Sequence, residues 1–584
     1  MKDASSLLAF LYGSGASTVA GRVSDLIERW RPHMPRRSDQ RGVPGLGQSA
    51  ALLITYADQL RREGEAPLRT LAEFCERRLR SVLTGVHVLP FFPSSSDDGF
   101  AVEDYLSVDP AFGTWDDIAR LAAHFELMFD AVLNHVSAQG RWFKAFLVDD
   151  PRYRDFFVTV AGAPDLTRVV RPRALPLLTE FPTAAGPRKV WTTFSADQVD
   201  LNYRNPDVLL SVLDVLLFYA ARGARFIRLD AVAFLWKEIG TTCLHLPQTH
   251  AIIQLLRAVL DEVAPGVLLV TETNVPHAEN ISYFGDGKHE AQLVYNFALP
   301  PLVLHSLATG SARALTRWAQ SLEPVSDRVA FFNFLASHDG VGLNPVRGIL
   351  EESEIEALVA RTRAHGGRIS LKAMPDGSKR PYEMNINYLD ALSNPAAGES
   401  PDLAARKLLC AHGILLSLQG VPGIYFHSLF GSRGDRRGAE TSGIARRINR
   451  ERLECAALEA ALNDTHSLRA RVFEGQCALL RQRQAHRAFA PTAPQEVLAL
   501  DARVFTVRRE SADGTDRVLC LHNVSGERVR LECGRGGDPI ELDGYEVRWR
   551  PEPGECSRTV RSLRRRGWPG GPPVSGARPN TRNT

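Results

Sequence analysis

The stretch ARFIRLDAV at residues 224–232 is a short apolar run that carries Arg228 and Asp230 near its end. It is followed by HAIIQLLRAVLDEVAP at 250–265, in which apolar residues recur at positions i, i+3, i+4 and i+7, the spacing of an amphipathic helix. A continuous apolar strand next to such a helix is typical of a parallel sheet that is covered on both faces. The stretch therefore predicts one unit of a parallel α/β fold.

Seven further apolar runs of this kind occur along the chain, with amphipathic helical stretches between most of them. They are ALLITYAD (51–58), GVHVLPFF (85–92), ELMFDAVLNH (126–135), GVLLVTETN (266–274), QLVYNFALP (292–300), RVAFFNFLASHD (328–339) and VPGIYFHS (421–428). Eight parallel strands joined by helical crossovers are the number that closes a TIM barrel. The predicted fold class is therefore α/β, a (β/α)8 TIM barrel.

The predicted barrel occupies residues 49–480 and contains two long connections. The connection at about 136–206, after the third strand, and the one at about 343–398, after the seventh, are too long to be plain helices. Both leave from the C-terminal rim, where barrel enzymes build their active sites. We predict that both are inserted subdomains.

Other units are predicted at the two ends of the chain. Residues 1–48 are helical up to about Trp30 and then become a linker rich in Pro, Arg and Gly. Short alternating strands over 490–552 predict a C-terminal antiparallel β domain. Residues 555–584 are rich in Pro, Gly and Arg with little to bury, which predicts a disordered tail.

Composition places the chain among ordinary globular proteins and gives no sign of a charged or membrane partner. Of its 584 residues 44% are hydrophobic, and 70 basic residues nearly balance 67 acidic ones. Its apolar runs stay well short of the roughly 18 residues that span a membrane. The eight cysteines form no CxxC pair and lie near no histidine at zinc spacing. We therefore expect a cytoplasmic protein with reduced thiols, no metal, no cofactor, and no nucleic-acid or membrane partner; its oligomeric state stays open.

Polar residues gather where the predicted strands end. They are Asp130, Asn134 and His135 at the third strand, Arg228 and Asp230 at the fourth, Glu272 at the fifth, and His338 and Asp339 at the seventh. Each alone has a structural explanation, such as holding a loop. In a parallel barrel, however, these ends meet at one rim, and a fold does not collect buried like charges for stability alone. The set therefore predicts an active site.

Several carboxylates and an arginine at one rim suit glycosyl transfer with retention. One carboxylate attacks the anomeric carbon, and a protonated partner gives its proton to the leaving oxygen. Crowding of acids raises at least one pKa and so supplies that proton donor near neutral pH.

The motifs DAVLNH, ARFIRLDAV, TET and ASHD resemble, in order and spacing, the four signature regions of the α-amylase superfamily, glycoside hydrolase family 13. The resemblance implies that the catalytic residues are Asp230 as nucleophile, Glu272 as general acid/base and Asp339 as transition-state stabiliser. It also implies that Arg228 positions the nucleophile. His135 and His338 would then hydrogen-bond the hydroxyls of the glucosyl group.

Residues 50–450 are more closely similar to the sucrose phosphorylase subfamily. The matching segments are SSSDDGF (94–100), RPRALPLLT (171–179), SADQVDLN (195–202), PYEMNINY (381–388) and RRINR (446–450). The resemblance implies a glucose site that includes Asp97, Phe100, Gln198 and Arg450, and a phosphate or acceptor site that includes Arg173 and Tyr382, with a mobile acceptor loop at about 380–388.

The sequence departs from the sucrose phosphorylase pattern on the acceptor side. Glu383 replaces a glutamine, and GVPGIYFHSLFGSRGD (420–435) differs as well. LITYADQ, ASHDGVGLNPVRG and HSLFGSR resemble the branch of the subfamily that acts on glucosylglycerate. That branch implies the reaction of 2-O-α-D-glucosyl-D-glycerate with phosphate to give α-D-glucose 1-phosphate and D-glycerate.

Glycerate and phosphate are both anions, and arginine is the expected side chain for binding either. Arg171, Arg173 and Arg433 would lie on rim loops, and Lys237 follows the nucleophile closely, so we place all four near the acceptor. The alternative is that these are ordinary surface residues in an arginine-rich chain.

The predicted enzyme is a retaining phosphorylase that works by double displacement through a β-glucosyl-enzyme, with inorganic phosphate as a substrate. Phosphorylases of sucrose, sucrose 6-phosphate or glucosylglycerol remain alternatives because they differ only in the acceptor. An α-glucosidase is disfavoured by the RPR and mobile-loop segments. A non-catalytic amylase-like partner protein is disfavoured because Asp230, Glu272 and Asp339 are all present.

Overall fold

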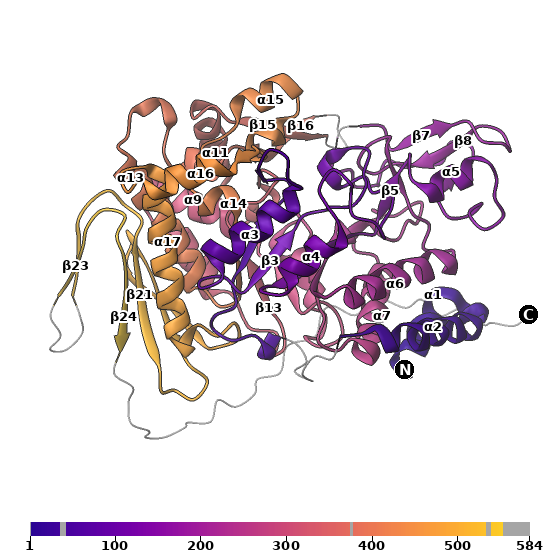
Figure 1. Ribbon diagram of the computed structural model, residues 1–584, viewed down its shortest axis with the longest axis horizontal. Coiled ribbons are helices and arrows are strands. Elements are labelled where there is room, and N and C mark those ends of the chain that lie inside the picture. Colours follow the sequence, from indigo (N-terminus) through magenta and orange to yellow (C-terminus); the bar gives the residue numbers. More distant parts are fainter. Residues whose placement is uncertain (1, 36–42, 174, 374–377, 533–538, 553–584) are drawn as a thin grey trace, which may run out of the picture.

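The computed structural model describes residues 2–35, 43–173, 175–373, 378–532 and 539–552 (Figure 1). At its centre eight parallel strands form a closed barrel in the order β1-β17-β13-β12-β11-β10-β4-β3. They are β1 (Leu52–Thr55), β3 (Gly85–Val88), β4 (Glu126–Val132), β10 (Ala224–Asp230), β11 (Leu268–Thr271), β12 (Leu293–Tyr295), β13 (Ala330–Asn333) and β17 (Val421–Tyr425). Each lies within one of the eight apolar runs, so the predicted (β/α)8 barrel is confirmed.

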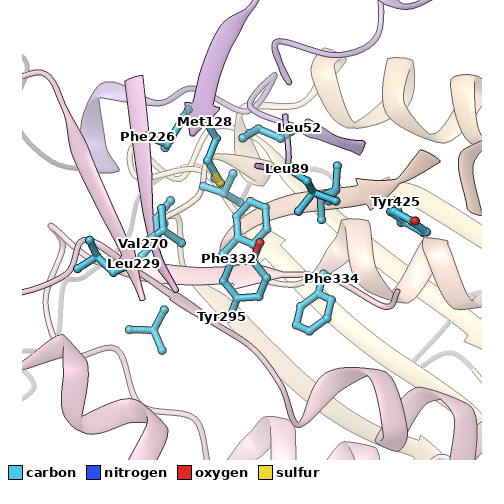
Figure 2. Close-up of a cluster of buried hydrophobic side chains, with 14 of the residues drawn as sticks. Leu52, Leu89, Met128, Phe226, Leu229, Val270, Tyr295, Phe332, Phe334 and Tyr425 are labelled. Carbon is cyan, nitrogen blue, oxygen red and sulfur yellow. The ribbon is translucent and has the colours of Figure 1, made fainter. Parts of the chain in front are cut away.

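The interior of the barrel is filled by apolar side chains from several strands (Figure 2). Met128, Phe226, Val270 and Phe332 are all almost completely buried there. Such layers of large side chains make the barrel a packed core rather than a pore. Ligands can therefore be bound only at its ends.

Helices surround the barrel, and four of them begin with a proline, which suits the first helical turn because that position needs no N–H donor. These four are α3 (Pro67–Leu79), α6 (Pro206–Ala221), α7 (Pro247–Val263) and α13 (Pro401–Ser417). The helix predicted at 250–265 corresponds to α7. Further helices are α4 (Trp115–Ala122), α8 (His277–Asn280), α9 (Leu299–Thr309), α10 (Arg313–Gln320), α14 (Phe426–Leu429), α15 (Arg436–Ser442), α16 (Cys455–Asn463) and α17 (Leu468–Ala485).

The two long connections contain small sheets of their own. In the first, β5 (His135–Ser137) pairs with β9 (Gln198–Asp200), and β6 (Thr159–Val160), β8 (Arg188–Trp191) and β7 (Leu178–Phe181) form a three-stranded sheet near α5 (Arg141–Leu147). In the second, β16 (Lys379–Asn385) lies between β14 (Val341–Gly342) and β15 (Arg368–Ala373). Helices α11 (Glu352–Ala364) and α12 (Tyr388–Leu392) complete the second insertion. Two short strands elsewhere, β2 (Leu60–Arg61) and β18 (Leu453–Glu454), pair with each other.

The N-terminal helices and the C-terminal sheet pack on opposite sides of the barrel (Figure 1). Helices α1 (Lys2–Tyr12) and α2 (Ala16–Trp30) lie against α7 and α6. At the other side β19 (Gln495–Asp501), β20 (Val504–Glu510), β21 (Arg517–Asn523) and β24 (Val547–Glu552) form the predicted antiparallel sheet, beside the pair β22 (Val529–Leu531) and β23 (Ile540–Leu542). Strands β19 and β23 were not predicted from the sequence. The tail predicted at 555–584 lies outside the described residues, and the exact limits of the domains stay predictions.

Within the described ranges, no helix is both long and apolar enough to cross a membrane. The six cysteines that the structure describes are buried, unpaired thiols.

The close packing of β17 on β13 yields a test of the fold. A Cβ atom added to Gly423 would lie 2.4 Å from Cζ of Phe332, whose ring is fully buried. We expect Gly423→Ala to lower stability by about 1–3 kcal/mol, because the overpacked ring must leave its preferred position. Thermal unfolding followed by circular dichroism would measure the change.

Gly21→Ala in α2 is the matched control. Its added methyl group meets no atom within 4 Å, and it replaces a glycine inside a helix. We expect it to raise stability slightly, by about 0.5–1 kcal/mol. Equal unfolding temperatures for the Gly423→Ala variant and the unaltered protein would contradict the packing described here.

Candidate active site

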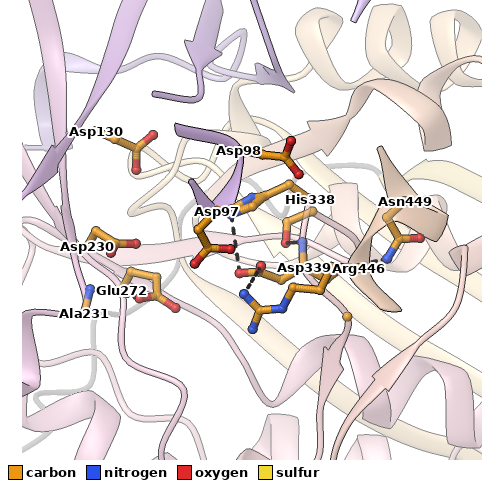
Figure 3. Close-up of polar contacts among 12 residues, drawn as sticks. Asp97, Asp98, Asp130, Asp230, Ala231, Glu272, His338, Asp339, Arg446 and Asn449 are labelled. Atoms are coloured by element: carbon orange, nitrogen blue, oxygen red, sulfur yellow. Dashed lines mark hydrogen bonds and ion pairs between the residues drawn. The ribbon is translucent and has the colours of Figure 1, made fainter. Parts of the chain in front are cut away.

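Most of the polar residues at the strand ends line one cavity of about 680 Å³ at the carboxyl end of the barrel (Figure 3). Its lining includes Asp97, His135, Asp230, Glu272, His338 and Asp339. Asp230 is the last residue of β10, Glu272 follows β11 directly, and Asp339 follows β13 by a short loop. The structure thus brings together the three acids that the sequence analysis selected.

Arg228 of β10 links the carboxylates at the base of this cavity. Its side chain is only 2% exposed, and its Nη1 donates to Oδ1 of Asp230 at 2.9 Å and to Oδ1 of Asp130. Its Nη2 lies 3.9 Å from Oε2 of Glu272. Asp130 also contacts Nε2 of His87 at 2.6 Å. One guanidinium therefore balances several buried acids, which explains how the fold tolerates them.

Asp230 and Glu272 share a strongly perturbed environment. Burial raises the pKa of both carboxyls; Asp339 raises the pKa of Glu272, and Glu272 raises that of Asp230. Each carboxyl therefore favours its protonated form more than a solvent-exposed acid does. Arg228 lowers the pKa of both acids, and it contacts Asp230 directly while lying farther from Glu272, so it stabilises a negative charge more on Asp230 than on Glu272.

The turn after β10 fixes the direction of Glu272. Ala231 has a φ of 48°, in the left-handed region that alanine seldom adopts. In this conformation the Ala231 amide donates to Oε2 of Glu272 at 3.1 Å. A strained residue next to two buried acids is typical of a functional site.

Asp339 has the opposite electrostatic setting. Its Oδ1 lies 2.7 Å from Nη1 of Arg446 and 3.4 Å from Nη2 of Arg450, and the neighbouring His338 is close as well. These groups hold the pKa of Asp339 well below its usual range despite burial. Asp339 is therefore a permanent negative charge in the cavity, unlike Glu272.

The two histidines are neutral donors and acceptors. Burial lowers the pKa of His135 to about 4 and that of His338 to about 3. His135 Nε2 is 3.0 Å from the carbonyl oxygen of Phe100, and His338 stacks on the Phe100 ring at 4.8 Å between centroids. A neutral imidazole can donate one hydrogen bond and accept another, which suits sugar hydroxyls.

Another acid and its partners form a further part of the cavity wall. Oδ2 of Asp97 accepts from Nη2 of Arg173 at 3.0 Å and from Nε2 of Gln198 at 3.3 Å. Arg173 holds the pKa of Asp97 below its usual range. The expected phosphate-binding arginine and the expected glucose-binding aspartate are thus in direct contact. Arg450, by contrast, lines a separate smaller pocket and binds Asp98 at 2.6 Å.

Arg446 is a site residue that the sequence analysis missed. It bridges Asp339 and the buried Glu383, whose Oε1 lies 3.1 Å from Nη2 of Arg446. Glu383 also accepts a hydrogen bond from the amide of Gly340 at 2.8 Å, and Tyr382 lines the cavity beside it. Arg446 stands in the RRINR segment, in which only Arg450 matched a family residue. Nothing in the sequence places Arg446 beside Asp339, so it was not predicted.

Three basic residues expected near the acceptor lie elsewhere. The Lys237 ammonium is buried and contacts Asp200 and Asn134, both at 2.6 Å. Arg433 binds Asp390 at 3.0 Å and the carbonyl of Ser393 at 2.7 Å. Arg171 donates to the carbonyl of Leu175. Lys237 and Arg433 are paired with acids, and none of the three lines the cavity.

In the part of the chain that the structure describes, no three His, Cys, Asp or Glu side chains are arranged to hold a metal ion.

The sequence matches the catalytic domain of α-amylase over residues 82–343. A glucosylglycerate phosphorylase from Allomeiothermus silvanus is 53% identical over 89% of this chain and 91% of its own length. One from Escherichia coli is 45% identical over 92% and 96%. The crystal structure of sucrose 6F-phosphate phosphorylase from Thermoanaerobacter thermosaccharolyticum superposes with a TM-score of 0.72 at 25% identity, covering 85% of this chain and 98% of that one. The chain therefore belongs to the glucosylglycerate phosphorylase family, a group of glycoside phosphorylases within the α-amylase superfamily.

Proposed function

We propose that this protein catalyses the reversible phosphorolysis of 2-O-α-D-glucosyl-D-glycerate to α-D-glucose 1-phosphate and D-glycerate. The observation that carries the proposal is the arrangement of Asp230 and Glu272 around Arg228 in a cavity that also contains Asp339. Relatives named for this activity share 45% to 53% of their residues with the chain. An acid pair of unequal ionisation is what a retaining glucosyl transfer requires.

In the first displacement an oxygen of Asp230 bonds to the anomeric carbon as the bond from that carbon to the glycerate oxygen breaks. Glu272 gives its proton to this oxygen, so D-glycerate leaves as an alcohol. The product on the protein is a β-glucosyl ester of Asp230. Arg228 favours the ionised form of Asp230 before the attack, through the contact at 2.9 Å.

In the second displacement an oxygen of phosphate bonds to the anomeric carbon, and the ester bond to Asp230 breaks. Glu272 takes the proton of the attacking phosphate hydroxyl, which returns both acids to their starting forms. Two inversions give net retention and the α-anomer of glucose 1-phosphate. The permanent negative charge of Asp339 stabilises the positive charge that develops on the sugar in both steps.

The glucose moiety is proposed to bind next to these acids. His135, His338, Gln198 and Asp97 line the cavity with groups that pair with hydroxyls, and Phe100 offers an apolar face. Arg450 does not line this cavity and acts on the same region through its contacts with Asp98 and Asp339. Arg173, Tyr382 and Glu383 remain assigned to the phosphate or acceptor side of the cavity.

A panel of donors tests the proposed function. Purified protein in phosphate buffer would be given glucosylglycerate, glucosylglycerol, sucrose or sucrose 6-phosphate, and release of α-D-glucose 1-phosphate would be measured. We expect the highest kcat/KM with glucosylglycerate. A higher kcat/KM with another donor would show that glycerate is not the preferred acceptor. Hydrolysis of the donor without formation of glucose 1-phosphate would refute phosphorolysis itself.

The separate roles of the two acids are tested by changing the leaving group. Glu272→Gln should slow phosphorolysis of glucosylglycerate by about 10²- to 10⁴-fold, since the departing oxygen then lacks a proton donor. With α-D-glucosyl fluoride, whose leaving group needs little protonation, the first displacement should largely survive and release fluoride in a burst. Asp230→Ala should release no fluoride above background. Equal losses with both donors would argue against Glu272 as the acid.

The raised pKa of Glu272 predicts a pH dependence. Glu272 donates only in its protonated form, which exists below its pKa, so turnover of glucosylglycerate should fall as the pH rises through that value. Fluoride release in the first displacement should not show this fall. Profiles of kcat/KM against pH for the two donors would measure it, and parallel profiles would contradict the assignment.

A further inference from the structure

Two basic residues face each other across the hairpin of the second insertion. Strands β15 and β16 are antiparallel, and Lys372 pairs directly with Arg380 in their register. The two strands run side by side above the barrel in Figure 1, and both residues line the cavity that holds the three acids. Directly opposed residues share one face of a sheet, where like charges destabilise the pairing. Such a pair calls for a compensating negative charge.

Nearby acids supply this charge only in part. Nη2 of Arg380 lies 3.4 Å from Oε2 of Glu352, but Arg347 already binds that oxygen at 2.8 Å. Among the described residues the Lys372 ammonium has no hydrogen-bond or ion-pair partner; Glu279 across the cavity is the acid whose field reaches it. Burial and Arg347 lower the pKa of Lys372, as expected for a cation without a close partner.

The other basic side chains of the cavity wall are already neutralised. Arg173 donates to Asp97 at 3.0 Å, and Arg446 lies between Asp339 and Glu383, at 2.7 and 3.1 Å. Of the four lysine and arginine residues in the lining, Arg173 and Arg446 therefore have acids of their own. The positive charge that the acids neutralise least is on Lys372, which has no close acid, and on Arg380, which shares Glu352 with Arg347.

We propose that Lys372 and Arg380 form the oxyanion-binding element of the acceptor site. The inference rests on the proposed function, in which glycerate and phosphate, both anions, in turn occupy the space next to the glucosyl group. The ligand group is a carboxylate or phosphate oxygen, held by an ammonium and a guanidinium on facing strands. The two residues bind the acceptor and take no part in the chemical steps.

Lys372→Met tests the proposal because methionine keeps the length of the side chain and removes its charge. Synthesis from α-D-glucose 1-phosphate would be measured with D-glycerate and with glycerol, which lacks the carboxylate. We expect the preference for glycerate over glycerol, as a ratio of kcat/KM, to fall about tenfold or more, as for the loss of one charge-assisted hydrogen bond. Lys372→Arg should retain most of the preference.

Lys379→Met is the matched control, since Lys379 is an exposed lysine next to Arg380 that does not line the cavity. It should leave both acceptors unaffected. The KM for phosphate, measured in the phosphorolytic direction with each variant, identifies the source of the anion. A rise in the KM for phosphate alone would show that the pair binds phosphate. A fall in the glycerate preference alone would show that it binds the carboxylate of glycerate. Both changes together would show that it binds each anion in turn.

An unchanged glycerate preference together with an unchanged KM for phosphate in Lys372→Met would overturn the inference while leaving the proposed function intact. Failure of the unaltered protein to glucosylate glycerate would instead refute the proposed function. The phosphate measurement, made with whichever donor the protein accepts, would then still decide whether the pair binds an anion.

Discussion

The guanidinium of Arg228 is the feature on which the proposed active site depends. It lies on the central part of the buried β10 and contacts Asp130 and Asp230, with Glu272 at 3.9 Å. Without this cation, three carboxyls in one dry space would each have to be neutralised by a proton. With it, one acid next to the sugar can stay ionised while its neighbour keeps a proton. In the proposed mechanism the barrel thus gives two carboxyl groups two different roles.

The barrel register makes this arrangement possible. Arg228 lies directly opposite Asp130 of β4, and Glu272 receives its hydrogen bond from Ala231, just beyond the end of β10. A shift by one residue would turn Arg228 toward the surrounding helices and remove the cation from the acids. The packed interior of the barrel, with Phe332 against Gly423, therefore fixes the electrostatics of the cavity as well as the fold.

The strands and the residues at their ends could be predicted because both depend on local pattern. Apolar runs mark buried strands, and polar residues such as Glu272 and Asp339 stand where those runs stop. The positions of Lys237 and Arg433 could not be predicted in this way, since both lie on loops whose paths are set by distant partners, Asp200 and Asp390. A basic residue on a loop pairs with the nearest buried acid, which the sequence alone does not reveal.

The hairpin of the second insertion shows the same limit for strand pairing. The register of β15 and β16 shifts between Ser370 and Leu371, and this irregularity decides which residues oppose each other beyond it. Lys372 lies opposite Arg380 in the part of the hairpin beyond this shift. The repulsive pair is therefore a product of tertiary structure and cannot be identified from the spacing of charges along the chain.

The charged side chains of the cavity lie on two parts of the fold, the barrel side and the inserted hairpin. Each part suits one half of the proposed substrate, the glucosyl group or the acceptor. Next to the three acids, Arg228 and Arg446 are each paired with carboxylates, which suits a glucosyl group that carries no charge of its own. The excess of positive charge lies on the inserted hairpin, where the proposed acceptors are anions. Barrel strand ends supply the groups that any glucosyl transfer needs, whereas an insertion can change without disturbing them. The proposed acceptor charges thus lie on a different element from the three proposed catalytic acids.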